Sequence, residues 1–320
     1  MRMSYEKAAK IILEQCLKVK KDERVLVIAD KNTKKIGQGI FEEAKNIAKA
    51  EFVLIPVGKQ NGEEPPADVA RKILEFDVII APTTKSLTHT NAIKIAKERG
   101  ARIATLPGIT DRIMKESVVA DYNKIAEFSK KIEMFLIEKK EVHVTTGRGT
   151  DFRFSVDGRK WLLDVGLIHK SGQCGNIPAG EVFIAPLEGT ANGVIVIDEF
   201  VHEKEVYAKK GVKIFIEKGE AVKMSDERCK IAGYFKKIKN ARNIAEFGIG
   251  TNEKAKIIGN ILQDEKVLGT IHIAFGNNSA IGGKVYSELH LDTVLQKPTI
   301  IVDEKILMKD GKFLIYGYLR

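Results

Sequence analysis

The sequence predicts an α/β fold, in which an N-terminal doubly wound parallel-sheet domain is followed by a β-rich α+β domain. Two changes of pattern along the 320 residues indicate this. Short apolar runs alternate with amphipathic helical patterns up to about residue 118, and apolar and polar residues alternate with a period of two beyond residue 140. We therefore expect a Rossmann-like α/β domain over residues 1–118, a helical connector over 119–140 and a β-rich domain over 141–320.

The first domain reads as successive βαβ units. Helical spacing covers residues 5–19, 33–50, 67–75 and 91–100, and the apolar runs ERVLVIAD, EFVLIPVG, FDVIIAP and ARIATLPG lie between or after these segments. Strands separated by helices of this length predict a parallel sheet, whose ligands gather at the carboxyl ends of the strands. The chain has neither GxGxxG nor GxxxxGK[ST], so a nucleotide site would lack its phosphate-binding loop.

The second domain reads as hairpins. After the charged helical stretch 120–140, EVHVTTGRGTDFRFSVDGRKW alternates with a period of two and turns at glycine and at Asp-Gly. EVFIAP, GVIVIDEFV and VKIFIEKGEAV continue the pattern. Helical spacing predicts two further helices, near residues 225–235 and 253–262.

Composition narrows the class of protein. The net charge is +10, but the lysines are interspersed with acidic residues and aromatic residues are few, so we expect no nucleic-acid partner. No apolar run reaches the 18–20 residues of a membrane span, and the N-terminus is charged and amphipathic, so we expect a cytoplasmic protein. Abundant Lys, Glu and Ile are typical of a thermophile. The three cysteines show no CxxC spacing and are expected to be reduced.

Two histidines stand in strand-like sequence near the C-terminus. In GTIHIAFG, alternation places His272 on one face with small residues, while the isoleucines and the phenylalanine face the core. In LHLD, the leucines face the core, and His290 and Asp292 point together to the other side. A His-x-Asp pair by itself is commonly a surface ion pair, so this motif carries weight only together with further ligands.

Two carboxylates supply that further support. Glu181 opens an apolar strand after Pro-Ala-Gly, and Glu246 lies in NIAEFGIGTN between apolar residues and glycines. A buried carboxylate requires compensation, which a divalent cation provides. Three carboxylates and two imidazoles suit Zn, Co, Mn or Fe rather than Ca. Five ligands exceed the need of one zinc ion and suit two ions roughly 3.5–4 Å apart.

Four segments, PAGEVFIAP, AEFGIGTN, GTIHIAFG and HLD, resemble in this order the metal-binding segments of the aminopeptidase T and aminopeptidase S family. GRGTDFRFSVDGRKW resembles the start of that family's catalytic domain. The resemblance implies that residues 141–320 form a catalytic metal-binding domain of a homodimer. It also implies a two-metal site whose ligands are Glu181, Glu246, His272, His290 and Asp292.

The function expected from this resemblance is a metal-dependent aminopeptidase. Two ions of Zn, Co or Mn would activate a water molecule against a peptide substrate, with Glu181 or Glu246 moving the proton and Glu181 taken as the catalytic residue. Two features depart from the family, whose members are longer and carry a tyrosine where this chain has Ser279.

Two alternatives remain open. A shorter branch of the same superfamily includes 2,5-dihydroxypyridine dioxygenase, which uses one Fe(II). Here His272, His290 and Asp292 would form its two-histidine, one-carboxylate face, and the substrate would be a small molecule. The other alternative is a relative that binds a metal or a ligand and has little or no catalytic power.

Overall fold

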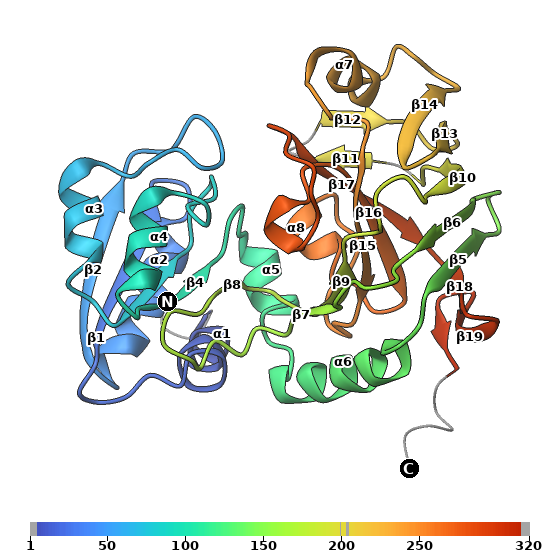
Figure 1. Ribbon diagram of the computed structural model, residues 1–320. Coiled ribbons are helices and arrows are strands. Elements are labelled where there is room, and N and C mark those ends of the chain that lie inside the picture. Colours follow the sequence, from blue (N-terminus) through green and yellow to red (C-terminus); the bar gives the residue numbers. More distant parts are fainter. Residues whose placement is uncertain (1–4, 199, 203–204, 315–320) are drawn as a thin grey trace. The chain divides into compact units, whose positions relative to one another are not determined.

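The computed structural model describes residues 5–198, 200–202 and 205–314 (Figure 1). The chain forms two compact units. Unit 1 comprises Met1–Ala126 and Asp164–Ala179, and unit 2 comprises Glu127–Leu163 and Gly180–Arg320. The predicted fold class is confirmed, with a parallel sheet first and antiparallel sheets after it. Residues 164–179, which the sequence analysis assigned to the second domain, belong to unit 1.

Unit 1 is built on a parallel sheet with the order β2-β1-β3-β4-β8 among its described residues. The strands are β1 (Arg24–Asp30), β2 (Lys49–Ile55), β3 (Val78–Ala81), β4 (Arg102–Thr105) and β8 (Cys174–Asn176). The helices are α1 (Glu6–Lys10) with its π-helical continuation η2 (Ile11–Cys16), α2 (Lys34–Lys45), α3 (Ala67–Ile73), α4 (Asn91–Glu98) and α5 (Asp111–Glu116).

Helices cover both faces of this sheet, as a doubly wound fold requires. Leu26 and Ile28 of β1 share a buried cluster with residues of α3 and α4. Ala29 points to the opposite face, where α2 approaches so closely that a Cβ on Gly37 would lie 2.7 Å from the Ala29 Cβ. Side chains of successive strand residues thus meet different helices, as the period of two dictates.

The fifth strand of the sheet was not predicted. Strand β8 pairs in parallel with β4, Cys174 lying beside Ile103 and Asn176 beside Thr105. It has three residues with a glycine at its centre, so the sequence shows no apolar period that marks it as a strand. This pairing is what returns residues 164–179 to unit 1.

Unit 2 begins within α6 (Tyr122–Leu136), the predicted connector helix. Its larger sheet has the order β14-β13-β10-β6-β5-β18-β19-β20 in the described chain. These strands are β5 (Glu141–Thr146), β6 (Asp151–Ser155), β10 (Asn192–Val196), β13 (Lys213–Glu217), β14 (Glu220–Met224), β18 (Pro298–Val302), β19 (Lys305–Lys309) and β20 (Lys312–Phe313).

The second sheet of unit 2 has the order β17-β16-β15-β9-β7. Its strands are β7 (Leu162–Asp164), β9 (Glu181–Ile184), β15 (Ile244–Gly250), β16 (Thr270–Gly276) and β17 (His290–Gln296). Strands β11 (Phe200–His202) and β12 (Glu205–Ala208) form a separate hairpin. The remaining short elements are α7 (Lys230–Lys237), α8 (Ile261–Asp264) and the 3-10 helix η3 (Ser279–Ile281).

The prediction of a helix near residues 253–262 is wrong over most of this range. Only α8 is helical there, and the preceding segment is a loop. The Asp264 carboxylate accepts hydrogen bonds from the backbone N–H groups of Ile258 and Gly259, and the Asn252 side chain accepts from Lys254 and Ala255. Side-chain acceptors of this kind compete with helical hydrogen bonds and stabilise turns instead.

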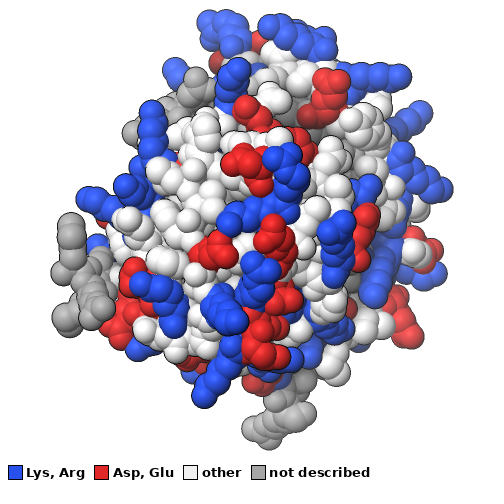
Figure 2. Space-filling view, turned by 90° about the vertical axis from the view of Figure 1, so that its left-hand side faces the viewer, with Lys and Arg blue, Asp and Glu red and all other residues white. Residues whose placement is uncertain are grey.

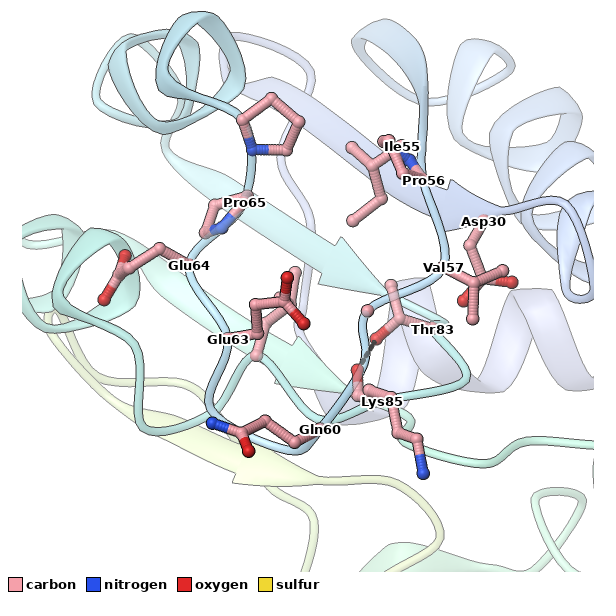
Figure 3. A pocket seen from close by; sticks show the side chains of 13 residues that line it. Asp30, Ile55, Pro56, Val57, Gln60, Glu63, Glu64, Pro65, Thr83 and Lys85 are labelled. Carbon is pink, nitrogen blue, oxygen red and sulfur yellow. Dashed lines mark hydrogen bonds between the residues drawn. The ribbon is translucent and has the colours of Figure 1, made fainter.

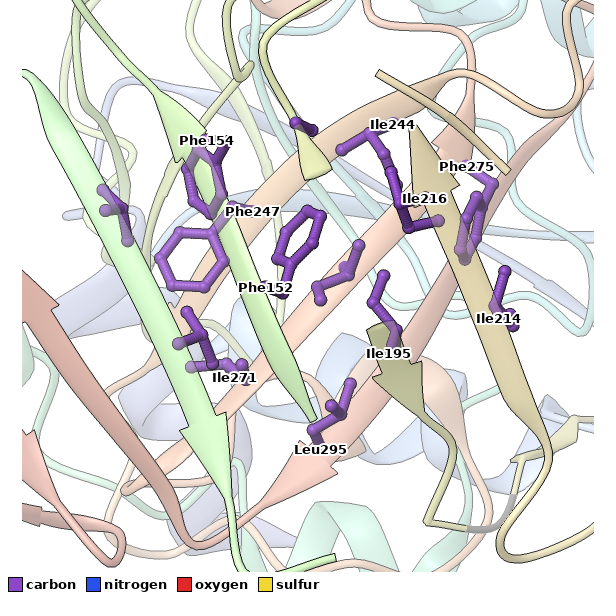
Figure 4. Close-up of a cluster of buried hydrophobic side chains, with 14 of the residues drawn as sticks. Phe152, Phe154, Ile195, Ile214, Ile216, Ile244, Phe247, Ile271, Phe275 and Leu295 are labelled. Carbon is purple, nitrogen blue, oxygen red and sulfur yellow. The ribbon is translucent and has the colours of Figure 1, made fainter. Parts of the chain in front are cut away.

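The two sheets of unit 2 pack face to face around one apolar core (Figure 4). Phe154 of the larger sheet meets Phe247 of the smaller, with ring centroids 5.0 Å apart. Ile271, Ile273 and Phe275 of β16 lie in the same core, as their alternation predicts. The opposite face of the smaller sheet is therefore free to carry polar side chains.

Charged side chains of both signs are mixed on the surface, as they are along the sequence. On the face shown in Figure 2, basic and acidic side chains are interspersed and do not gather into a large area of one sign. Within the described residues, we find no helix with the length and apolar character needed to cross a bilayer.

Candidate metal centre

The candidate ligands lie on the sheet β17-β16-β15-β9-β7 of unit 2, on the face that points away from the apolar core. Each ligand pairs with a small residue of a neighbouring strand. Directly paired residues of antiparallel strands project to the same side, so the register decides what surrounds each side chain. The pairs are Glu181 with Gly250, His272 with Gly248, Glu246 with Ala274, Asp292 with Ala274, and His290 with Gly276. Small partners leave space for five functional groups to converge.

Gly248 shows how tight this arrangement is. A Cβ at this position would lie 2.0 Å from Cε1 and 2.1 Å from Nε2 of His272. The imidazole thus occupies the volume that any larger residue at position 248 would fill. Close approach of a functional group is one of the reasons for glycine inside a strand.

The five groups predicted from the sequence meet around the Glu246 carboxylate. Its Oε1 lies 3.2 Å from His272 Nε2, and its Oε2 lies 3.5 Å from His290 Nε2. Glu181 Oε2 is 3.4 Å from His272 Nε2, and Asp292 Oδ1 is 3.6 Å from His290 Nε2. In the described part of the chain, the ligand atoms fall into two sets that share Glu246, and within each set all atoms lie within 4.8 Å of one another: Glu181, Glu246 and His272, and Glu246, His290 and Asp292.

The residues present fit a divalent ion. The carboxylates of Glu181 and Glu246 are 8% and 9% exposed, and His272 is 1% exposed. Glu181 Oε2 and His272 Nδ1 are buried without a hydrogen-bond partner among the described residues. Buried carboxylates with free lone pairs beside imidazole nitrogens are the donor set of a borderline metal ion, which would compensate their desolvation.

Electrostatics inside the site favour cations. Burial opposes protonation of His272, but the carboxylates of Glu246 and Glu181 outweigh it and raise the His272 pKa to about 9. Burial likewise opposes protonation of His290, and Asp292 and Glu246 raise its pKa to about 10. Burial alone would raise the pKa of Asp292, yet the neighbouring histidines and Lys266 hold it well below its usual range. A metal ion therefore displaces protons when it binds.

A loop orients His290. The carbonyl oxygen of Asn277 accepts a hydrogen bond from His290 Nδ1 at 2.8 Å, so Nε2 carries the free lone pair when the ring is neutral. Glu188 fixes this loop by accepting from the Asn278 side chain at 3.0 Å and from the Lys284 backbone at 2.7 Å. The Arg159 guanidinium contacts both Glu188 and the carbonyl oxygen of Gly282.

Sequence reasoning missed Lys266 and Glu265. The Lys266 ammonium lies 2.6 Å from Glu181 Oε1 and 2.7 Å from Glu265 Oε1, and the lysine side chain is 2% exposed. In the sequence both residues sit in QDEKVLG, which reads as a charged surface turn. Only the fold shows that this turn passes beside the site, so no pattern in the sequence could have revealed it.

The position of the family tyrosine holds Ser279, and the nearby phenol in the sequence is that of Tyr286. Ser279 begins η3, and its hydroxyl donates to the Asn277 side chain at 2.8 Å. Tyr286 is 68% exposed. The departure from the aminopeptidase pattern noted in the sequence therefore persists in the structure.

Unit 1 has a hollow of its own at the carboxyl ends of β1, β2 and β3, the place expected for a doubly wound sheet (Figure 3). It has a volume of about 200 Å³ and is lined by Asp30, Thr83 and Lys85 among others. The Asp30 carboxylate accepts hydrogen bonds from the backbone of Asn32, Thr33 and Thr84. Asp30 thus organises the loops around the hollow.

Comparisons with known proteins now identify the family. The family model described as NicX, 2,5-dihydroxypyridine 5,6-dioxygenase, matches residues 5–315. A curated 2,5-dihydroxypyridine 5,6-dioxygenase of Pseudomonas putida KT2440 is 24% identical over 194 residues. That alignment spans 56% of this chain and about half, 55%, of the length of the relative.

Two solved structures share the fold. The 2,5-dihydroxypyridine dioxygenase from Pseudomonas putida KT2440 superposes with a TM-score of 0.83 at 18% identity, covering 100% of this chain and 99% of that one. AmpT from Thermus thermophilus superposes with a TM-score of 0.74 at 16% identity, covering 97% and 99%. The likeness to AmpT thus shows a shared fold, and the aminopeptidase family itself is not confirmed. The match over nearly the whole chain shows that it belongs to the 2,5-dihydroxypyridine 5,6-dioxygenase family.

Proposed function

We propose that this protein is an iron-dependent dioxygenase that opens a dihydroxylated aromatic ring, such as that of 2,5-dihydroxypyridine. Family membership supports this function. The observation that carries it is that His272, His290 and Asp292 lie on one sheet face, with both imidazoles beside the Glu246 carboxylate and Asp292 beside His290. Two histidines and one carboxylate on one side of Fe(II) leave further coordination positions open for substrate and oxygen.

The metal ion and the residues around it would have separate roles in this reaction. Bound Fe(II) supplies the activation of oxygen and a binding point for the ring hydroxyl. The Lys266 ammonium holds one carboxylate oxygen of Glu181. The other oxygen has no hydrogen-bond partner among the described residues and lies 3.4 Å from His272 Nε2, so Glu181 is placed to accept a hydroxyl proton. The Asn277 carbonyl orients the His290 ring through Nδ1, so Nε2 would be the atom that holds the ion.

A metallo-aminopeptidase remains the second candidate, because Glu181 and Glu246 stand beside the three residues above and because AmpT shares the fold. Such an enzyme would need two ions around a water molecule. Ser279 in place of the family tyrosine weakens this candidate, as does the ion pair that joins Glu181 to Lys266.

One assay separates the two functions. The protein is loaded anaerobically with Fe(II), and oxygen uptake is followed after addition of 2,5-dihydroxypyridine. Parallel samples with Co, Mn or Zn receive aminoacyl p-nitroanilides. We expect oxygen uptake and no nitroaniline. Peptide hydrolysis without oxygen uptake would reverse the assignment, and turnover in neither arm would leave only a binding role.

A matched pair of variants links the activity to the site. Asp292→Asn should abolish oxygen uptake, since it removes the carboxylate of the proposed ligand face. His143→Gln is the control, because His143 pairs with Asp151 at 2.8 Å on the other sheet of the same unit. Equal loss of activity in both variants would point to unfolding and not to the metal.

A further inference from the structure

The hollow in unit 1 lies where the strand order of its sheet reverses. From β1 the chain moves outward to β2 and then returns to place β3 on the other side of β1. Helix α2, which follows β1, packs on the face of Ala29, and α4, which follows β3, packs on the opposite face with Leu26 and Ile28. The loops after β1 and β3 therefore diverge and leave a crevice between them, which is where open α/β sheets bind ligands.

Internal hydrogen bonds hold the floor of the hollow in place. Asp30, at the end of β1, and Thr83, just after β3, are 1% and 2% exposed. The Thr84 hydroxyl donates to Asp30 Oδ1 at 3.0 Å, and the Thr33 hydroxyl donates to the Pro82 carbonyl at 2.6 Å. These bonds join the loop after β1 to the loop after β3, so the floor keeps its shape without a ligand.

The loop 56–66, between β2 and α3, forms the wall of the hollow. Three of its residues are proline, which restricts its backbone. The Gly62 N–H donates to the Ser86 carbonyl at 2.8 Å, and the Asn61 side chain accepts from the Ser86 N–H at 2.9 Å. Glu64 accepts from backbone N–H groups at the start of α4. A wall held in this way keeps the cavity preformed, which lowers the entropy cost of binding.

Glu63 is the acidic group of the hollow with an open hydrogen-bonding position. Its Oε2 accepts from the Lys59 backbone N–H, and among the described residues we find no hydrogen bond to its Oε1. Figure 3 shows the Glu63 carboxylate within the hollow. The site therefore offers a ligand a negatively charged acceptor.

The remaining lining residues define the rest of the ligand. Among the described residues of the lining, three carboxylates stand against a single lysine, Lys85, so the hollow favours a cation. Ile55, Val57 and Leu87 offer an apolar surface beside them. The volume of about 200 Å³ has room for roughly seven non-hydrogen atoms, at about 30 Å³ for each water-sized group.

We propose that the hollow of unit 1 binds a small organic ammonium ion, a primary amine with a compact apolar body. Its ammonium group pairs with Glu63, and its apolar part lies against Ile55, Val57 and Leu87. Every lining residue belongs to unit 1 and none is a candidate metal ligand, so this site goes beyond the proposed dioxygenase function and is tested without it.

Cyclohexylamine, which has seven non-hydrogen atoms and is charged at pH 7, is the probe. It is titrated into the full chain with labelled methyl groups, and the methyl resonances of Ile55, Val57 and Leu87 are followed by nuclear magnetic resonance. We expect saturable shifts of these resonances with a dissociation constant below about 10 mM. Cyclohexanol has the same shape without the charge, and cyclohexanecarboxylate carries the opposite charge, so both should bind at least about 10-fold more weakly.

Two variants and a control assign the binding to the hollow. Glu63→Gln keeps the shape of the side chain and removes its charge, so the affinity for cyclohexylamine should fall about 10–100-fold. Val57→Trp should abolish binding by filling the cavity. Glu98→Gln, at an exposed position of α4, is the control and should bind as the wild type does.

Three results would overturn the inference. Shifts that do not saturate, or that spare the methyl groups of the hollow, would show that the amine does not bind there. Equal binding of cyclohexanol would show that the hollow does not recognise charge. Unchanged affinity in folded Glu63→Gln would remove Glu63 as the partner of the ammonium. None of these results depends on oxygen uptake, so failure of the proposed function would leave this inference standing.

Discussion

Gly248→Ala places one methyl group against the candidate metal centre. Its Cβ would lie 2.0 Å from His272 Cε1. An ordinary carbon contact is about 3.5 Å, so the imidazole has to move by roughly 1.5 Å, the difference between these two distances. The His272 side chain is 1% exposed, so the movement takes place inside the protein. The backbone at Gly248 is not in the left-handed region, so the collision with the ring is the main effect.

The consequence for metal binding follows from ligand geometry. Metal–ligand distances tolerate a change of only about 0.2 Å, and loss of an orienting partner alone costs 10–100-fold in affinity. We therefore expect Gly248→Ala to weaken Mn(II) binding by at least about 100-fold in a calorimetric titration. Overpacking should also lower the free energy of unfolding by about 1–3 kcal/mol, measured by denaturant titration.

Gly233→Ala is the matched control. Gly233 lies in α7, and a Cβ there has no neighbour within 4 Å apart from its own helix. Because alanine favours a helix over glycine, this variant should be as stable as the wild type or more stable by up to about 1 kcal/mol, with unchanged metal affinity. Normal metal binding by folded Gly248→Ala would refute the placement of the His272 ring.

Three further predictions concern protons, the loop and unit 1. Because the pKa values of His272 and His290 are raised to about 9 and 10, metal binding at pH 7 should release close to two protons, measured by calorimetry in buffers of different ionisation enthalpy, and affinity should rise with pH. Glu188→Gln weakens the acceptor that holds the loop beside His290, so metal affinity should fall about 10–100-fold in the same titration. Arg102→Ala leaves the Glu23 carboxylate without its buried partner, so the free energy of unfolding should fall by about 3 kcal/mol in denaturant titration while metal content stays constant.

Each of these predictions has a contradicting result. Release of no protons at pH 7 would show that the histidines are neutral before the metal binds. Glu217→Gln, at an exposed position of β13, is the control for Glu188→Gln. Equal metal affinities of the two variants would show that the loop held by Glu188 does not support metal binding by His290. If Arg102→Ala lowered the metal content as well as the free energy of unfolding, the ion pair of Arg102 and Glu23 would not be independent of the metal centre.

The sign of the pH effect on the metal-free protein follows from the same shifts. The pKa of His272 is raised on folding, so its contribution to stability is full below about pH 6.5 and disappears as the pH rises through about 9. The pKa of Asp292 is lowered, so its contribution is full above about pH 4 and is lost in acid. The contributions of His272 and Asp292 are therefore both present between about pH 4 and 6.5 in the metal-free protein.

Alternation along the strands was sufficient to predict which side chains of the metal centre share a face. His272, His290 and Asp292 were placed opposite the apolar residues of their own strands, and the structure places those apolar residues in the core. Each strand has a period of two, and this local rule survives folding because one face must be buried. The role of Gly248 could not be predicted, because it depends on the register between two strands.

Other features depend on contacts that sequence patterns do not encode. Lys266 reads as a surface lysine until the fold brings its turn over Gly250. Strand β8 exists because its neighbour β4 offers hydrogen bonds, and three residues are too few to show a period. The loop before α8 is held by Asp264, which lies beyond the helix predicted near residues 253–262.

The reaction was the hardest feature to predict. The segments around the candidate metal ligands resemble those of aminopeptidases and therefore favoured a hydrolase, whereas the family match favours the dioxygenase alternative. The choice between the two depends on how many cations the face holds and on what stands beside them. Ser279 was the one residue in the sequence that pointed away from the peptidase.

The most direct test of the account is diffraction at the iron absorption edge from crystals grown anaerobically with Fe(II). We expect a single anomalous peak per chain on the outer face of the β17-β16-β15-β9-β7 sheet. The peak should lie about 2 Å from the Nε2 atoms of His272 and His290 and from an oxygen of Asp292. A peak bound elsewhere, or no peak at these three residues in fully loaded crystals, would contradict it.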